Sequence, residues 1–157
     1  MNTKTSRIPF PFYLTRAREI TNGIDYTRRT ADGRGSSERV VGMSQAPSIA
    51  LGTVGVDKNR HHSISIQASK THYCEPRKNL EYWMYDSFEC GFPTRRDQII
   101  EPYSDGGGVY LRVPRAVLQA YIDKMGGIVG YISNYRTGDF SPIPLTHQEA
   151  TMYALKG

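Results

Sequence analysis

The chain has 157 residues, 38% of them hydrophobic, and a formal net charge of +5. This length favours one domain with a single core, and the charge suits an anionic partner such as a nucleotide or a nucleic acid without demanding one. No apolar run approaches the roughly 18 residues of a membrane-spanning helix, and the first residues lack the apolar stretch of a secretory signal. We therefore expect a cytoplasmic protein that does not bind membranes.

The first third of the chain predicts short elements between polar loops. Proline and glycine end each hydrophobic stretch after a few residues. Ser44 is expected to cap a short helix whose first turn holds Pro47. The arginine-rich run at 25–38 is interpreted either as a solvated loop or as a contact for phosphate or for an acceptor. In chain order, the predicted elements are a flexible tail over 1–9, a strand over 10–15, a helix over 16–22, a loop over 25–38, a strand over 39–43 and a helix over 49–51.

Strand patterns dominate the middle of the chain. Ile64, Ile66 and Ala68 alternate with polar residues, which predicts a strand over 62–69 with one buried face. Residues 79–86 are rich in aromatic and large apolar side chains, and these favour the extended state. Shorter strands are predicted from 98–100, over 109–113 and over 128–133.

Pro114 opens the clearest predicted helix, in which apolar residues recur at helical spacing until a glycine pair ends the stretch. Thr146 and Glu149 form a capping box that begins a last short helix, expected to run to Leu155. Together the elements predict one α+β domain over 1–157, with a mixed or antiparallel sheet and short helices. The apolar stripe of the clearest helix consists of Val117, Leu118, Tyr121, Ile122 and Met125.

Metal-ligating residues are few and badly spaced. Cys74 and Cys90 are the two cysteines, and the pair could be either reduced or bridged. With His61, His62 and His72 they contain neither a CxxC nor an HExxH motif. Because a structural zinc site needs four well-spaced ligands, no metal site is predicted.

The predicted strand over 79–86 carries an acid beside aromatic side chains. In the extended state Glu81, Trp83 and Tyr85 share one face. A carboxylate on such a partly apolar wall faces a cleft, holds a cation or has a raised pKa. The alternative is an edge-strand glutamate that points into water.

Three segments of the chain, taken in order, resemble the ADP-ribosyltransferase superfamily of pertussis- and cholera-type toxins and poly(ADP-ribose) polymerases. Residues 40–47 (VVGMSQAP) are similar to the toxin strand that ends in S-x-S before a helix. Residues 81–86 (EYWMYD) match the E-Y-x-x-Y-D pattern of the polymerase glutamate strand. Phe92-Pro93, followed by residues 97–99 (DQI), is similar to the turn after the toxin glutamate. The resemblance covers roughly residues 12–103.

This resemblance implies a split sheet with NAD, as substrate, in the cleft between its halves. It implies that Glu81 hydrogen-bonds a hydroxyl of the nicotinamide ribose and stabilises the positive charge that develops as nicotinamide leaves. Arg16 is then the second catalytic residue and meets the NAD phosphates or ribose. Asn79 is expected to contact the acceptor. Residues 104–157 lie outside the resemblance and are expected either to extend the sheet, with added helices, or to cap the cleft. The other NAD-binding residues are expected to be Tyr13, Ser44, Tyr82 and Tyr85.

The sequence also departs from the family pattern. The toxin branch has arginine directly after an aromatic residue of the first strand, but here Leu14 follows Tyr13 and Arg16 comes two positions later. Gly42 stands where S-x-S has its first serine. NAD binding is therefore better supported than full activity.

Two functional hypotheses follow. The first is a mono-ADP-ribosyltransferase that modifies a macromolecular acceptor, as a toxin, an effector or a phage-encoded host modifier. The second is a catalytically inactive protein that binds a nucleotide or nucleic acid, as a sponge or inhibitor, on the same or another basic α+β fold.

Overall fold

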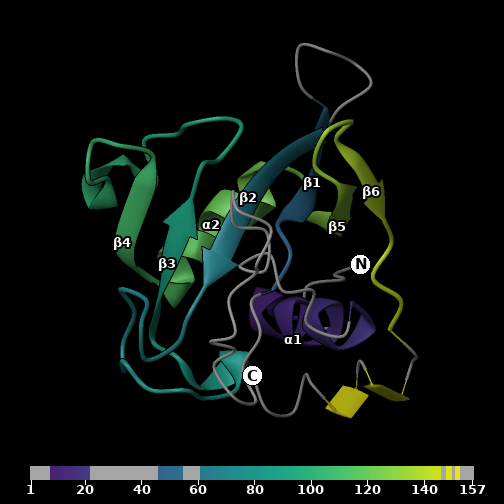
Figure 1. Ribbon diagram of the computed structural model, residues 1–157, viewed down its shortest axis with the longest axis horizontal. Coiled ribbons are helices and arrows are strands. Elements are labelled where there is room, and N and C mark those ends of the chain that lie inside the picture. Colours follow the sequence, from purple (N-terminus) through teal and green to yellow (C-terminus); the bar gives the residue numbers. More distant parts are fainter. Residues whose placement is uncertain (1–7, 22–45, 55–60, 146–147, 150, 153–157) are drawn as a thin grey trace, which may run out of the picture.

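A six-stranded antiparallel sheet organises the computed structural model, with strand order β4-β3-β2-β1-β5-β6 (Figure 1). The first four strands form a meander, after which the chain returns to place the fifth strand beside the first. The strands are β1 (Ile49–Val54), β2 (His61–Gln67), β3 (Ser87–Gly91), β4 (Val109–Pro114), β5 (Ile128–Asn134) and β6 (Asp139–Ser141). The structure describes residues 8–21, 46–54, 61–145, 148–149 and 151–152.

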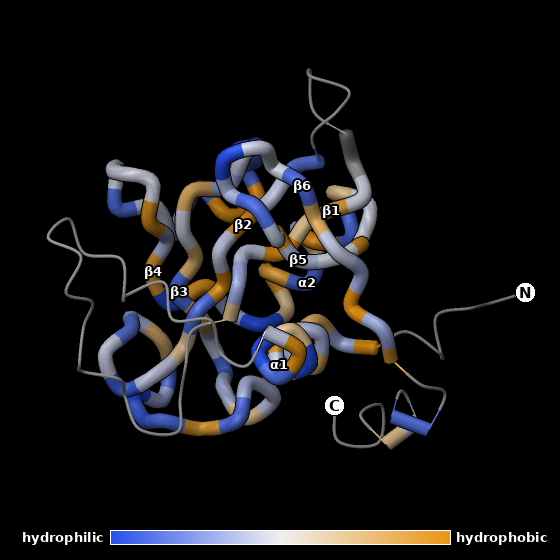
Figure 2. Tube along the Cα trace, turned by 45° about the vertical axis from the view of Figure 1, so that its right-hand side comes forward, coloured by the Kyte–Doolittle hydropathy of each residue, from blue (hydrophilic) through white to orange (hydrophobic). Residues whose placement is uncertain are grey.

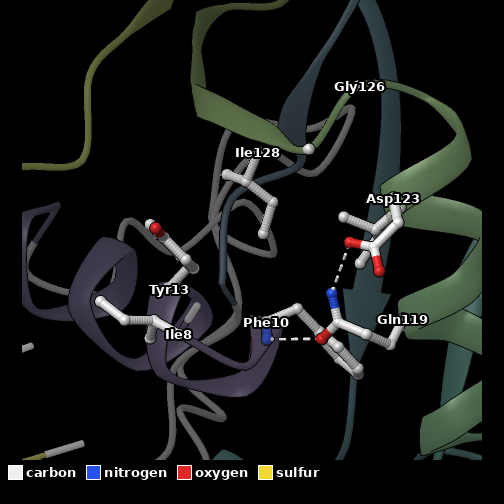
Figure 3. Close-up of a pocket in the computed structure, with 9 residues that line it drawn as sticks. Ile8, Phe10, Tyr13, Gln119, Asp123, Gly126 and Ile128 are labelled. Carbon is white, nitrogen blue, oxygen red and sulfur yellow. Dashed lines mark hydrogen bonds between the residues drawn. The ribbon is translucent and has the colours of Figure 1, made fainter. Parts of the chain in front are cut away.

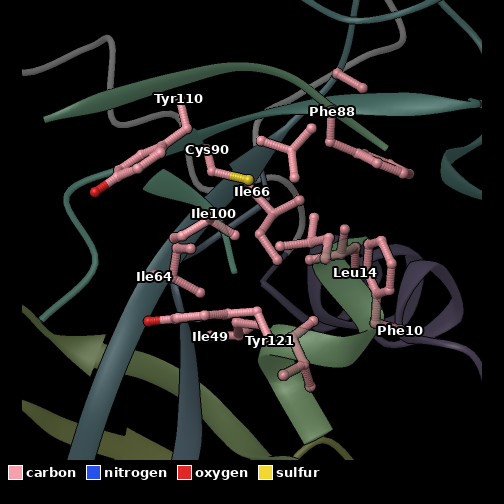
Figure 4. Packing of buried hydrophobic residues seen from close by; sticks show 14 of the residues in the cluster. Phe10, Leu14, Ile49, Ile64, Ile66, Phe88, Cys90, Ile100, Tyr110 and Tyr121 are labelled. Carbon is pink, nitrogen blue, oxygen red and sulfur yellow. The ribbon is translucent and has the colours of Figure 1, made fainter. Parts of the chain in front are cut away.

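Two helices supply side chains to the core of this sheet. α1 (Phe10–Ile20) contributes Phe10 and Leu14, and α2 (Arg115–Lys124) makes the crossover from β4 to β5. Figure 4 shows the tight cluster that these side chains form with those of the central strands. The described part of the chain is therefore α+β, as predicted from the sequence. No helix within it is long and apolar enough to cross a bilayer.

The strand predicted over 62–69 is confirmed in its central part, although β2 ends at Gln67 and that side chain is buried. Ile64 and Ile66 are buried, whereas Ser63 and Ser65 are partly exposed. This alternation matches a strand with one face on the core. The strands predicted over 109–113 and 128–133 also form, as β4 and β5.

The helix predicted from Pro114 is confirmed as α2, together with its ending. The Gly127 N–H donates to the Ile122 carbonyl (2.9 Å) and the Gly126 N–H to the Asp123 carbonyl (3.1 Å). These two bonds form a Schellman motif, in which Gly126 takes the left-handed conformation (φ 93°) that favours glycine. The glycine pair therefore ends α2 by the mechanism that its sequence position suggests.

The strand predicted over 10–15 is wrong, because these residues form the first half of α1. Pro11 suggested an edge strand, but proline also fits the first turn of a helix, where its missing N–H has no intrahelical partner. Phe10, Leu14 and Ala17 are spaced by four and three residues, and all are buried. Helical spacing therefore explains their burial.

The helix predicted over 49–51 is also wrong, because these residues begin β1. β1 pairs with β2 on one side and with β5 on the other. Ile49, Ala50 and Leu51 are all fully buried. A central strand covered on both faces has a continuous apolar run, which a short sequence window cannot distinguish from a buried helix.

Residues 79–86 do not form the predicted strand. Glu81 is extended, but Tyr82–Met84 form a 3₁₀ turn. Tyr82 and Tyr85 are both buried, and their spacing of three suits such a turn, whereas strict alternation would put them on opposite faces. The Arg115 guanidinium donates to the carbonyls of Trp83 and Tyr85, which replaces the bonds of a strand ladder.

The strand predicted from 98–100 is a turn instead. The Asp97 side chain accepts from the Ile99 N–H (2.9 Å), and its carbonyl accepts from the Ile100 N–H (3.1 Å). A 3₁₀ turn over Glu101–Tyr103 follows, with Pro102 near its start. An aspartate that bonds the backbone two residues on favours a turn over a strand.

Several predictions fall on other parts of the chain. Residues 1–7 of the predicted tail, the loop at 25–38, the strand at 39–43 and Ser44 lie outside the described residues. The same holds for Thr146 and Leu155, although residues 148–149 and 151–152 are helical.

Candidate functional site

Glu81 lies beside Arg18, not beside the predicted Arg16. The Glu81 carboxylate accepts from Arg18 Nη2 at 3.2 Å, and the Arg18 guanidinium lies 4.8 Å from the centre of the Tyr82 ring. The Glu81 side chain is 49% exposed. The structure thus brings one predicted catalytic residue together with an arginine that the sequence did not single out.

Arg16 holds a different segment. Its Nε donates to the Pro144 carbonyl at 3.2 Å, and its guanidinium lies near the carboxylates of Glu19 (3.6 Å) and Glu149 (3.7 Å). These contacts tie α1 to the chain beyond β6. Arg16 and Glu81 are therefore on separate contact networks.

The two tyrosines predicted to bind NAD are buried. The Tyr82 hydroxyl accepts from the Ala46 N–H (3.2 Å), and burial raises the pKa of Tyr82 to about 12. The Tyr85 hydroxyl donates to the Lys78 carbonyl (2.5 Å) and accepts from the Leu80 N–H (2.8 Å), and burial raises its pKa as well. Both side chains hold the loop that carries Glu81.

The remaining predicted site residues are dispersed. The Asn79 side-chain oxygen accepts from the Lys70 N–H at 3.0 Å, so it closes a loop. Tyr13 is half-buried on α1, and burial raises its pKa. Ser44 lies outside the described residues, so its role stays a prediction.

Sequence reasoning missed a cluster of two arginines and a tyrosine. The guanidinium carbons of Arg77 and Arg112 lie 5.1 Å and 5.5 Å from the centre of the Tyr73 ring. Tyr73 is 44% exposed. Tyr73 and Arg77 come from the loop that joins β2 to β3, which is largely hydrophilic (Figure 2), and Arg112 comes from β4. We call these three residues the Tyr73 cluster.

A bulge in β4 builds this cluster. Phe88 pairs with Val113 and Cys90 with Tyr110, so β4 has one more residue than β3 between these pairs. Arg112 lies in this bulge with a positive φ of 49°. The conformation is costly for a residue with a Cβ, and the surrounding structure must hold it in place.

The backbone of Tyr73 is fixed at both ends. Its carbonyl accepts from the Arg112 N–H at 3.0 Å, and its N–H donates to Glu89 Oε1 at 2.9 Å. The bulged residue therefore turns its N–H away from the β3 ladder and towards the loop. In this way the loop and β4 hold the aromatic ring and both guanidinium groups in register.

The Tyr73 cluster carries excess positive charge. Within the part of the chain that the structure describes, no carboxylate forms an ion pair with Arg77 or Arg112. Burial raises the pKa of the Cys74 thiol, the charges of Arg77 and Arg112 lower it, and the charge of Glu89 raises it, so Glu89 lies near this thiol as the two arginines do. Arg77 and Arg112 thus place two positive charges beside the Tyr73 ring, against the one carboxylate of Glu89 that bonds its backbone.

The histidines and cysteines do not gather into a metal site among the described residues. His72 Nδ1 lies 2.6 Å from the Ser69 hydroxyl, and the Cys74 thiol donates to the Ser69 carbonyl at 3.2 Å. Both side chains therefore stabilise the turn at Ser69, at the start of the loop that joins β2 to β3.

Comparisons with protein-family models, curated proteins and solved structures find no match to this chain. Its function therefore has to be inferred from its own residues.

Proposed function

We propose that the protein binds single-stranded nucleic acid at the Tyr73 cluster. The observation that carries this proposal is the placement of two guanidinium groups, unpaired among the described residues, over one exposed tyrosine ring. The proposal corresponds to the second hypothesis from the sequence, a basic α+β protein that binds a nucleic acid.

The cluster suits both parts of a nucleotide. A guanidinium group presents a planar fork of donors that matches phosphate oxygens, and it stays charged at all relevant pH values. A base can stack on an exposed aromatic ring or on the planar guanidinium groups that lie over it, and stacking on an aromatic side chain contributes about 1–3 kcal/mol per base. The ring also orders the two arginines before a ligand arrives, which lowers the entropy lost on binding.

Two further features support the proposal. Arg112 keeps a strained backbone, and such strain persists where the surrounding structure and a function require it. The net charge of +5 attracts a polyanion more strongly than it attracts a mononucleotide.

The test is fluorescence anisotropy with a labelled oligothymidylate of about 12 nucleotides. We expect the double variant Arg77→Gln/Arg112→Gln to bind at least about tenfold more weakly than the wild type. The matched control is Arg96→Gln/Lys124→Gln, which removes the same charge from residues already paired with Glu101 and Asp97. Equal losses in both double variants would show that only net charge matters and would overturn the proposal.

A second arm isolates stacking. Tyr73→Leu keeps an apolar side chain but removes the ring, so it should weaken binding of oligothymidylate more than binding of inorganic polyphosphate, which loses only the ordering of the arginines. Duplex DNA of the same length should bind more weakly than the single strand, because its bases are already stacked. Tighter binding of the duplex, or equal weakening of oligothymidylate and polyphosphate binding by Tyr73→Leu, would show that the site does not recognise single-stranded bases.

A second candidate is the mono-ADP-ribosyl transfer that the sequence resemblance implies, with NAD as substrate. One observation favours it: Glu81 and Arg18, distant in sequence, place a carboxylate and a guanidinium 3.2 Å apart. Arg18 could meet the NAD phosphates in place of Arg16, while Glu81 stabilises the cationic ribose. We rank it second because the carboxylate is about half exposed, whereas such stabilisation is strongest where water is excluded.

Labelled NAD tests this candidate directly. Incubation with a cell lysate should label an acceptor in the presence of the wild type, and Glu81→Gln should lower the rate by about 10²–10³. Equal labelling by the two proteins would remove Glu81 from the mechanism.

A further inference from the structure

A pocket of about 370 Å³ lies where α1, the end of α2 and the start of β5 meet (Figure 3). Its lining combines apolar side chains, Ile8 and Phe10 on the α1 side and Ile122 and Ile128 on the other, with a polar side that Gln119 and Asp123 form. The volume is within the range of sites that bind small organic molecules. The pocket is separate from the Tyr73 cluster.

Hydrogen bonds order the polar side of this pocket. The Phe10 N–H donates to Gln119 Oε1 at 3.0 Å, and Gln119 Nε2 donates to Asp123 Oδ1 at 3.0 Å (Figure 3). Gln119 therefore links the start of α1 to the carboxylate in the last turn of α2. The amide is oriented at both ends, and this places Asp123 at the pocket edge.

The glycine pair keeps space open beside Asp123. Gly127 has a φ of 79°, and a Cβ built on it would meet no atom within 4 Å. Space therefore remains beside the end of α2. A ligand in this space would lie against a helix C-terminus, which carries partial negative charge.

We propose that this pocket binds a small organic cation with an apolar body, of the aryl-alkylamine class. The lining combines a carboxylate with the negative end of α2, and among the described residues that line it none is basic. An ammonium group is stabilised beside Asp123, whereas the apolar body packs on Ile122 and Ile128. The Tyr13 ring on α1 adds an aromatic wall.

The experiment compares two probes that share a phenyl ring and differ in charge, phenethylamine and phenylacetate. Each is titrated into the full chain while the amide resonances of Gly126 and Gly127 are followed in two-dimensional proton–nitrogen NMR spectra. We expect the amine to shift both resonances and to bind at least about tenfold more tightly than the carboxylate. Equal affinity of the two probes, or no shift at either glycine, would overturn the proposal.

Asp123→Asn tests the charge without removing an acceptor for Gln119. The affinity of this variant for phenethylamine should fall about tenfold, and its preference for phenethylamine over phenylacetate should disappear. The matched control, Asp139→Asn on the exposed β6, should change the affinity by less than about twofold. Equal losses in the two variants would assign the effect to net charge and would also overturn the proposal. If Asp123→Asn does not fold, the comparison of the two probes in the wild type decides the question.

Discussion

At the scale of single residues, Arg112 shows a conflict between stability and the proposed function. Its φ of 49° is one that glycine adopts without a penalty, yet the chain has an arginine there. The same position puts its guanidinium over Tyr73 and its N–H on the Tyr73 carbonyl. The side chain, and not the backbone, therefore accounts for an arginine at the bulge.

Replacing Arg112 with glycine should separate these two effects. We expect Arg112→Gly to raise the free energy of unfolding by about 1 kcal/mol. Relief of the backbone strain stabilises the folded state by more than the greater freedom of glycine stabilises the unfolded chain. Affinity for oligothymidylate should fall at the same time. Urea unfolding and fluorescence anisotropy measure the two quantities. Arg112→Ala keeps the strain, so a stability gain of equal size in that variant would contradict this account.

His62 is a second residue whose surroundings have a measurable consequence. It is 7% exposed, and its Nδ1 has no hydrogen-bond partner among the described residues. Burial lowers its pKa, and the charges of Arg95 and His61 lower it further. The folded protein therefore binds a proton at His62 less readily than the unfolded chain does.

This difference predicts that the protein loses stability in mild acid. The contribution of His62 is fully present above its unfolded pKa of about 6.5 and decreases as the pH falls towards its lower folded value. The pKa of His72 is also lowered, mainly by burial, so its contribution has the same sign. Urea unfolding at about pH 5 and about pH 7.5 should give a lower free energy of unfolding at the acidic pH. In His62→Phe the difference should shrink, and an unchanged difference would exclude His62 as a cause.

At the scale of elements, the end of α2 and strand β1 meet through their backbones. The Gly52 N–H donates to the Gly127 carbonyl at 2.8 Å. A Cβ built on Gly52 would lie 2.4 Å from the Gly126 carbonyl oxygen, which is part of the backbone and cannot rotate away. A side chain at this position would therefore push α2 from the sheet.

Gly52→Ala should lower the free energy of unfolding by about 1–3 kcal/mol, as overpacking in a core does. Chemical denaturation measures this change. Gly91→Ala is the matched control, because a Cβ at that strand position would lie 3.7 Å from Ser65 Cβ, which is an ordinary contact. A loss of equal size in both variants would mean that strand glycines in general, and not this contact, set the stability.

At the scale of the whole molecule, charge is unevenly distributed. The net charge is +5, and the Tyr73 cluster shares in this excess, whereas the described lining of the α1–α2 pocket contains a carboxylate and no basic residue. The proposed nucleic-acid partner and the proposed small cation therefore have opposite charges. Each site can be altered with little effect on the other.

The salt dependence of binding provides a test at this scale. For single strands, the slope of log affinity against log salt concentration changes by about 0.7 for each phosphate contact. We expect the slope of Arg77→Gln/Arg112→Gln to be shallower than that of the wild type by about 1.4, which corresponds to two contacts. Arg96→Gln/Lys124→Gln should keep the wild-type slope. Two equal slopes for wild type and the Tyr73-cluster variant would show that these arginines make no phosphate contacts.

Part of the fold could be predicted from local pattern. Ile64 and Ile66 alternate with serines, and the stripe of α2 ends at a glycine pair, so β2 and α2 were predictable from spacing alone. Pro11 was ambiguous, since it suits both an edge strand and a first helical turn. The residues after Pro11 distinguish a helix from a strand only when the packed core shows which of their side chains are buried.

The candidate site was less predictable. Glu81 was singled out from its sequence neighbours, but its partner Arg18 is distant in the chain, and nothing local distinguishes Arg18 from Arg16. Tyr73 and Arg77 lie in a polar loop with other basic residues, which is a weak local signal. No local signal indicates that Arg112 joins them, because it reaches Tyr73 through a bulge in β4.

The α+β class, the alternating strands and the end of α2 follow from the amino-acid sequence, because these features depend on the periodicity of neighbouring side chains and on the conformations that glycine allows. That residues 49–51 form a central strand and 82–84 a turn follows only from long-range packing. It also decided which charged groups meet at Tyr73 and at Glu81. These outcomes depend on burial on both faces, on the bonds from Arg115 to distant carbonyls and on strand register, all of which join residues far apart in the chain.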